Sequence, residues 1–159
     1  QMGNDKYMSS VSFKNLLTEI VRSFEEISKK RISLNVEESQ KETIITRSPE
    51  ITYGIRNFVG NAVKYSKSEV NIFLKVDRYK VKLIISDNGP GFSNEVLENI
   101  GKPYIGSESA VLREKSGLGL GTFIGQTLLE RKKASLEFSN SQRGGALVNI
   151  SWNLDDIKI

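Results

Sequence analysis

The sequence of 159 residues has neither cysteine nor histidine. Without cysteine, the chain can form no disulfide, no thiol nucleophile and no thiolate metal site. Without histidine, it can hold no His-containing catalytic triad and no imidazole zinc site, and it cannot phosphorylate itself on histidine. A composition without cysteine also fits a reducing compartment, and we expect the protein to be cytoplasmic.

Long apolar runs and concentrated charge are missing too. No apolar stretch approaches the roughly 20 residues that a membrane-spanning helix needs, so we expect no membrane contact. The net charge of +4 comes from 23 basic and 19 acidic residues spread along the chain. Nucleic-acid readers concentrate such charge in a basic stripe, so we expect no nucleic-acid partner. The expected organisation is a linker or cloning remnant at 1–10, one domain at 11–154 and a tail at 155–159.

Apolar residues at spacings of three and four predict a first helix over residues 13–31, with Ile27 as the last member of its apolar stripe. A second helix is expected from Ser48 to Tyr65, because Ser48 can cap it and Pro49 suits its first position. The other helical segments expected are 119–131 and, as a short piece, 94–100.

Alternating apolar and polar residues predict strands separated by polar turns. The first expected strand, 32–36, should have a short neighbour at 43–46, and two hairpins follow later in the chain. The strands of these hairpins are 70–76 with 81–86 and 135–138 with 146–152. The predicted fold is therefore α+β, a two-layer sandwich of about three helices on one face of a mixed five-stranded sheet.

Three polar residues of the second helix, Asn57, Asn61 and Lys64, share one face because their spacings are four and three. Taken alone, they are more typical of a solvated helix face than of a site. However, asparagine is a mediocre helix former, which makes two of them an unusual choice for such a face. An asparagine oxygen can ligate Mg²⁺, and a lysine one turn further on can meet phosphate.

Residues 87–91 read Asp-Asn-Gly-Pro-Gly and directly follow a predicted strand. Such a run is usually an ordinary turn. It can also hold the Asp87 carboxylate at the strand end, where a buried acid would accept a hydrogen bond from an exocyclic amine. In that case Gly89 and Gly91 would leave room for a flat ring.

Residues 117–121 read Gly-Leu-Gly-Leu-Gly immediately before the third predicted helix. Glycine backbone N–H groups at a helix N-terminus can approach phosphate oxygens closely. The run lacks the Gly-Lys-Ser/Thr of a Walker loop and the spacing of a dinucleotide-binding loop. Phosphate binding and a flexible hinge are the two interpretations of this run alone.

The order of these motifs resembles the nucleotide-binding family that contains gyrase, Hsp90-type chaperones, mismatch-repair ATPases and histidine kinases. The resemblance covers roughly residues 11–154. Within it, the asparagine helix corresponds to the N box, 87–91 to the first glycine box and 117–121 to the second. Residues 101–104 stand near the phenylalanine box, where Tyr104 departs from the usual phenylalanine. The resemblance implies the Bergerat (GHKL) ATP-binding fold, with ATP and Mg²⁺ as ligands.

Position 57 distinguishes members of that family. Relatives that hydrolyse ATP or phosphorylate serine or threonine carry a glutamate base one turn before the metal-binding asparagine. This sequence has Asn57 there, and an amide cannot take up a proton at neutral pH. The chain therefore most resembles the catalytic and ATP-binding domain of sensor histidine kinases, whose imidazole acceptor needs no such base. A stand-alone anti-sigma-factor-type serine kinase and a non-catalytic nucleotide-binding module remain the alternatives.

The resemblance to histidine kinases implies a role for each motif. Asn61 would ligate Mg²⁺, Asn57 and Lys64 would assist at the phosphates as catalytic residues, Asp87 would read the adenine amine, and 92–116 would form the ATP lid. The residues expected to contact nucleotide are, in full, Asn57, Asn61, Lys64, Tyr65, Asp87, Gly89, Gly91, Gly117, Leu118, Gly119, Leu120, Gly121 and Thr122.

Partners also follow from the resemblance. The γ-phosphoryl group of ATP would pass to a histidine on an N-terminal dimerisation domain outside these residues, and then to a response regulator. The run 117–134 is most similar to the redox-responsive RegB type of bacterial sensor kinase. A parent protein of this kind can be anchored in the inner membrane.

Overall fold

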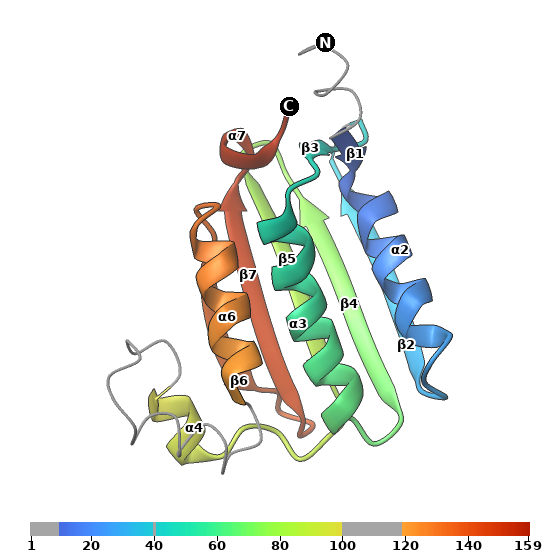
Figure 1. Cartoon of the computed structure of the whole chain (residues 1–159), viewed down its shortest axis with the longest axis vertical. Helices are drawn as coiled ribbons and strands as arrows, with labels where there is room; N and C mark the ends of the chain where they lie inside the picture. The colour runs from blue at the N-terminus through green and yellow to red at the C-terminus, as the bar shows by residue number, and fades with distance from the viewer. Residues whose placement is uncertain (1–9, 40, 100–118) are drawn as a thin grey trace.

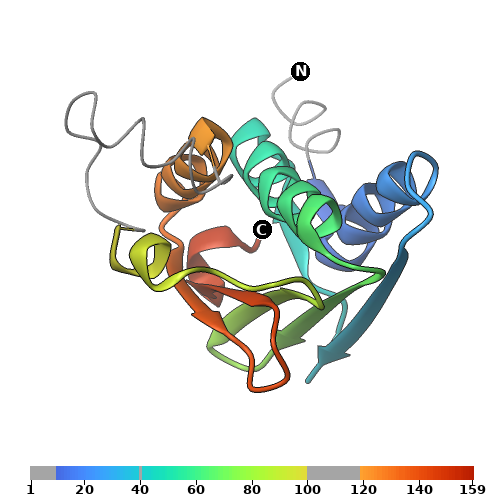
Figure 2. The same cartoon turned by 90° about the horizontal axis from the view of Figure 1, so that it is seen from below.

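The computed structural model describes residues 10–39, 41–99 and 119–159, with the backbone alone described at 119–121. Its helices α2, α3 and α6 lie side by side on one face of a twisted sheet (Figures 1 and 2). In chain order, the elements are β1 (Ser10–Ser12), α2 (Phe13–Glu25), β2 (Arg31–Glu38), β3 (Ile44–Thr46), α3 (Pro49–Tyr65), β4 (Glu69–Val76), β5 (Lys80–Asp87), α4 (Asn94–Asn99), α6 (Gly119–Glu130), β6 (Ser135–Asn140), β7 (Ala146–Asn153) and α7 (Leu154–Ile157).

The main sheet has five strands in the order β2-β4-β5-β7-β6. The β2 and β4 strands run parallel, with Ile32 opposite Val70, and every other neighbouring pair is antiparallel. A parallel pair needs a long crossover, which α3 supplies between these two strands. The predicted α+β sandwich on a mixed five-stranded sheet is confirmed.

The short strand β3 does not lie where the sequence placed it. We expected 43–46 beside 32–36, but β3 pairs with β1 in a separate two-stranded antiparallel ribbon, with Ser10 opposite Thr46. That pairing prediction is wrong. The cause is a competing contact before α2, where the Phe13 N–H donates to the Thr43 carbonyl at 2.9 Å and draws the segment to β1.

The first helix is well defined at its start and shorter than predicted at its end. The Ser12 hydroxyl accepts from the Asn15 N–H at 3.0 Å, which caps the N-terminus of α2. The helix ends at Glu25, so the prediction that it reaches residue 31 is wrong, and Ile27 is 78% exposed rather than part of the apolar stripe. The chain turns away after Glu25 and carries Lys30 toward the end of α3.

The central helix α3 has the predicted bounds. Its Ser48 cap accepts from the Ile51 N–H at 3.1 Å, and Pro49 occupies the first turn. Its apolar face is buried on the sheet, and α2 and α6 lie on its two sides (Figure 2). This placement gives α3 two lateral seams, one with each neighbouring helix.

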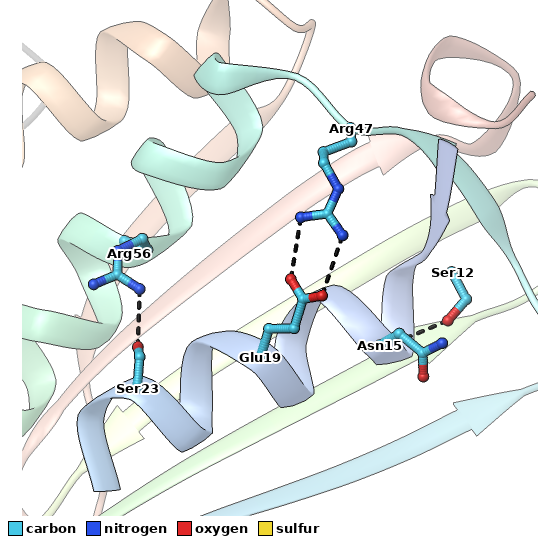
Figure 3. A network of polar contacts seen from close by, with 6 residues as sticks. All are labelled: Ser12, Asn15, Glu19, Ser23, Arg47 and Arg56. Atoms are coloured by element: carbon cyan, nitrogen blue, oxygen red, sulfur yellow. Dashed lines mark hydrogen bonds and ion pairs between the residues drawn. The ribbon is translucent and has the colours of Figure 1, made fainter. Parts of the chain in front are cut away.

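Polar contacts between α2 and the chain around α3 join the first of these seams (Figure 3). The Arg47 guanidinium donates to both carboxylate oxygens of Glu19, at 3.1 and 3.2 Å, and Arg56 donates to the Ser23 hydroxyl at 2.8 Å. The hydrogen bonds from Arg47 hold the pKa of Glu19 below its usual range.

The C-terminal segment packs onto the domain. Residues 154–157 form α7, in which Ile157 is buried, and the Ile159 N–H donates to the Ile44 carbonyl at 3.0 Å. The buried Trp152 lies nearby on β7, with its ring edge-on to Phe13 and the ring centroids 5.7 Å apart. Of the helices in the described residues, none combines the length and the apolar character needed to cross a membrane.

Candidate functional site

A cavity of about 430 Å³ is lined by α3, the segment that leads into α4, and the sheet, and it includes the last residues of α3 and β5. Its wall is apolar for the most part, with a few polar side chains, as is usual for ligand sites. The lining residues are Phe58, Asn61, Ala62 and Tyr65 of α3, Ile85 and Asp87 of β5, Pro90 to Val96 apart from Asn94, Thr122 of α6, Phe138 of β6, and Ala146 and Val148 of β7.

Asp87, the last residue of β5, lines this cavity. Its Oδ1 accepts from the Gly89 N–H at 2.8 Å and, more weakly, from the Ala146 N–H at 3.4 Å. These backbone donors fix the carboxylate plane. The second oxygen, Oδ2, is the acceptor that a ligand amine would meet.

The two predicted glycines beside Asp87 have a packing role that the sequence did not reveal. A Cβ on Gly89 would lie 2.2 Å from the Tyr65 carbonyl oxygen, so glycine permits the close approach of this segment to the end of α3. Gly91 has φ of +81°, and a Cβ there would lie 2.8 Å from Asn140 Oδ1. Both glycines therefore permit close backbone packing beside the cavity, and the expectation that they leave room for a flat ring stays a prediction.

Asn61 and Thr122 connect the two helices at the cavity wall. The Asn61 Nδ2 donates to the Thr122 Oγ1 at 2.7 Å, and Thr122 is only 5% exposed. Both residues line the cavity, as do the predicted Tyr65, Asp87 and Gly91. The structure thus brings together residues of α3, β5 and α6, which are separated by other elements in the sequence.

Three predicted residues that the structure describes in full, Asn57, Lys64 and Gly89, do not line the cavity. Asn57 lies one turn earlier on α3, and its Nδ2 donates to the Tyr53 carbonyl of the same helix at 2.8 Å. The Lys64 ammonium lies over the Tyr65 ring, 5.3 Å from the centroid. The roles of Asn57 and Lys64 at the phosphates remain predictions.

The sequence profile of the family described as "Histidine kinase-, DNA gyrase B-, and HSP90-like ATPase" matches residues 46–156. The chain belongs to this family. Membership confirms the resemblance that the order of the motifs predicted, and membership in an ATPase family implies that the chain binds ATP.

Similar proteins place the chain nearer to one branch of this family. The sensor histidine kinase RegB of Cereibacter sphaeroides is 31% identical over 136 residues, which cover 76% of this chain and 29% of RegB. The chain therefore spans about 29% of the length of this curated relative. The predicted similarity to RegB is confirmed at the level of sequence.

Solved structures of histidine kinases have the same fold. The nucleotide-free catalytic domain of ThkA gives a TM-score of 0.71 at 18% identity and covers 91% of this chain and 94% of that domain. Full-length ShkA, solved in complex with AMPPNP, gives 0.72 at 18% identity and covers 93% of this chain and 30% of ShkA. At this identity the likeness concerns the fold alone.

The second glycine box of the family lies partly within the described residues. Gly117 and Leu118 lie outside them, as do 101–104 and most of the expected lid. Gly119 begins α6, so the backbone from Gly119 to Thr122 forms its first turn. The N–H groups of a first turn make no hydrogen bonds within their own helix and carry partial positive charge, which suits phosphate.

Sequence reasoning missed the aromatic wall of the cavity and the residue that holds it. The rings of Phe58, Phe138 and Phe92 form a chain, with centroid distances of 5.9 and 6.1 Å. Asn140 accepts from the Phe92 N–H at 2.7 Å and donates to the Phe92 carbonyl at 2.8 Å, as a paired strand would. The only signal in the sequence was an asparagine two residues after a predicted strand, which more often marks a turn.

The described residues include no group of three or more acidic side chains that could hold a metal by itself. Asn61 lines the cavity, and its amide oxygen is of the kind that can serve as a single ligand of a hard cation. Mg²⁺ usually takes its remaining ligands from water and substrate phosphates. The donor set therefore fits a metal that arrives with a nucleotide.

Proposed function

We propose that this chain is the catalytic and ATP-binding domain of a sensor histidine kinase. It transfers the γ-phosphoryl group of ATP to a histidine carried outside these residues. The observation that supports this most directly is the single cavity wall shared by Asp87 and the Asn61–Thr122 pair, in a chain that belongs to the ATPase family.

The two ends of the cavity suit the two ends of ATP. Ile85, Ala62 and Val148 supply apolar surface for a purine, while Asp87 Oδ2 accepts from its exocyclic amine. The phosphates extend toward the first turn of α6, where backbone N–H groups neutralise part of their charge. Adenine recognition and phosphate binding are thereby assigned to different elements.

Mg²⁺ is part of this proposal, with Asn61 as its ligand from the chain. When bound, the cation neutralises charge on the phosphates during transfer. The chain itself binds and orients: it holds the purine, fixes the phosphates and presents the terminal phosphorus to an acceptor. Asn57 in place of a glutamate leaves no general base at that position, which favours an imidazole acceptor and disfavours a serine kinase.

The partners follow from the same proposal. The acceptor histidine is carried by an N-terminal dimerisation domain, and the phosphoryl group then passes to a response regulator. The similarity to RegB makes a redox-responsive parent kinase, anchored in the inner membrane with this domain in the cytoplasm, the natural context.

A pair of carboxylate variants tests the purine site by calorimetry. In Asp87→Asn the amide oxygen still accepts from the Gly89 N–H, so an NH2 donor replaces Oδ2 and faces the adenine amine, and we expect about a tenfold or greater loss of ATP affinity. Asp77→Asn is the control, because Asp77 is an exposed carboxylate in the turn between β4 and β5. Equal ATP affinity in both variants would contradict the assignment of the purine site.

Transfer is tested with labelled ATP and a separate histidine-bearing hairpin domain of a RegB-type kinase. Label on the histidine of that domain is the expected result. A non-catalytic nucleotide-binding module would bind ATP and transfer nothing, and a serine kinase would label serine.

A further inference from the structure

We infer that Lys30 is a positioning residue of the nucleotide site, which holds Tyr65 and the Asp87 segment in place by capping the C-terminal turn of α3. The inference rests on the proposed binding of adenine in this cavity. Lys30 does not line the cavity, and it acts through the backbone of the residues that do.

The hydrogen bonds that the Lys30 side chain donates all go to one turn of the chain. Its ammonium donates to the carbonyl oxygens of Val63 at 2.5 Å, Ser66 at 2.7 Å and, with longer geometry, Lys64 at 3.4 Å. An ammonium group has three donors and no acceptor, so all three are directed at the end of α3. Lys30 comes from the segment between α2 and β2, more than 30 residues earlier in the chain.

A cation is favoured at this place by the electrostatics of the helix. The last carbonyl groups of an α-helix have no partner within the helix and form the negative end of its dipole. The Ser66 N–H and hydroxyl satisfy the Ala62 and Val63 carbonyls in part. Lys30 adds charge to the same turn and reaches the Ser66 carbonyl beyond it.

The capped turn carries the cavity residue Tyr65. Lys30 contacts the carbonyls of the residues on both sides of it, Lys64 and Ser66. The carbonyl of Tyr65 itself faces Gly89, where even one added carbon would lie 2.2 Å away. A shift of this turn therefore moves the Tyr65 side of the cavity against its Asp87 side.

The opposite side of the same turn is held by Asn88. Its Oδ1 accepts from three successive N–H groups, those of Lys67, Ser68 and Glu69, at 2.9, 3.0 and 3.1 Å. Asn88 adjoins Asp87, so the turn is clamped between Lys30 and the first glycine box. Removing Lys30 releases one side of the clamp and leaves the other in place.

The segment that supplies Lys30 lies before residue 46, where the match to the family profile begins. The cavity thus depends on a side chain from the N-terminal part of the chain, which contributes none of its lining residues. A neighbouring lysine provides the control. Lys29 is exposed and makes no hydrogen bond or ion pair with any residue that the structure describes.

Three variants and two measurements test the inference. Lys30→Met keeps the apolar stem and removes the donors, Lys30→Arg keeps a charged donor, and Lys29→Met removes the adjacent charge. ATP affinity is measured by calorimetry, and amide hydrogen exchange of residues 65–69 by NMR. For Lys30→Met we expect ATP affinity to fall about five- to tenfold and exchange at these amides to accelerate. Lys30→Arg should restore at least half of the lost binding, on a logarithmic scale, and Lys29→Met should match the wild type.

A variant that destabilises the domain away from the cavity distinguishes a positioning role of Lys30 from a general effect on stability. Arg56→Met weakens the seam with α2, away from the cavity, and should lower the unfolding temperature without changing ATP affinity. The inference is wrong if Lys30→Met binds ATP within twofold of the wild type, or if Arg56→Met weakens ATP binding equally. If the wild-type chain binds no ATP, the proposed function fails. In that case unchanged exchange at residues 65–69 in Lys30→Met would overturn the inference as well.

Discussion

The two lateral seams of α3 differ in the way they are closed. Toward α6, the helices approach over glycine, and a Cβ on Gly54 would lie 2.6 Å from two carbons of Leu129. Toward α2, the contact is looser, and a Cβ on Gly60 would find its nearest neighbour, the Phe24 ring, at 3.4 Å. The two α3 glycines thus both face side chains, but only Gly54 lies so close to its neighbour that a methyl group has no room.

The polar residues at the two seams also differ in whether they line the cavity. On the α2 seam, Arg56 donates to the Ser23 hydroxyl and lies over the Phe24 ring, 5.0 Å from its centroid. On the α6 seam, Asn61 donates from its nitrogen to the Thr122 hydroxyl, and both residues line the cavity. The close seam therefore contributes a polar pair to the cavity wall, whereas Arg56 on the loose seam does not line the cavity.

The largest effect that separates the two seams is expected for Asn61→Ala compared with Arg56→Met. Loss of the partner of a metal ligand alone typically costs 10-fold to 100-fold in metal affinity, so loss of the proposed ligand Asn61 should weaken the Mg²⁺-dependent part of ATP binding about tenfold or more. Arg56→Met should leave that binding unchanged and lower the free energy of unfolding by about 1 kcal/mol.

Calorimetric titrations with ATP, with and without Mg²⁺, and urea unfolding of both variants provide the measurements. Mg²⁺-dependent binding that survives in Asn61→Ala would remove the metal role from the α6 seam. A loss of nucleotide binding in Arg56→Met would remove the distinction between the seams.

A smaller effect, of opposite sign at the two seams, is expected when each α3 glycine is replaced by alanine. In a helix interior this change alone stabilises by about 1 kcal/mol. Gly60→Ala has room for the methyl group and should gain most of that amount. At Gly54 the methyl group would meet the buried Leu129, and overpacking of about 1–3 kcal/mol should outweigh the gain.

Urea unfolding of the two alanine variants, with slopes compared to detect changes in the unfolded state, checks this pair. Stabilisation at both positions would mean that the α6 seam can open without cost, and the contrast between close and loose packing would be lost.

How much the sequence predicts depends on the range of the interaction that decides each element. The bounds of α3 follow from Ser48 and Pro49, which act within a single turn of the helix, and its prediction is confirmed. The pairing of β3 depends on β1, a three-residue strand more than 30 positions away, and that pairing was predicted wrongly. A strand of this length has no periodicity to detect.

The same distinction applies to the site. The structure places the predicted Asn61 and Asp87 on one cavity, and these residues stand in motifs whose spacing is local. Asn140 and Lys30 were missed, because they bond to backbone groups 48 and 36 positions away. The sequence around Asn140 and Lys30 does not reveal these partners, because nearly every residue carries the same backbone groups.

The smallest expected effect belongs to the α2 side, at the ion pair between Glu19 and Arg47. Its two hydrogen bonds hold the pKa of Glu19 below its usual range, so the folded state binds this proton less tightly than the unfolded state does. The resulting stabilisation is present above the unfolded pKa of about 4.3 and is lost as the pH falls through the lower pKa of the folded state.

Because the pair is largely exposed, Glu19→Gln should cost only about 0.5 kcal/mol at pH 7. The free energy of unfolding should also decline less steeply for Glu19→Gln than for the wild type as the pH falls below about 5. Glu25→Gln, at an exposed position on the same helix, is the matched control. Identical pH profiles for Glu19→Gln and the wild type would show that Arg47 does not hold the helix, whereas a change in ATP affinity at pH 7 would connect this seam to the cavity and end the separation between the two flanks of α3.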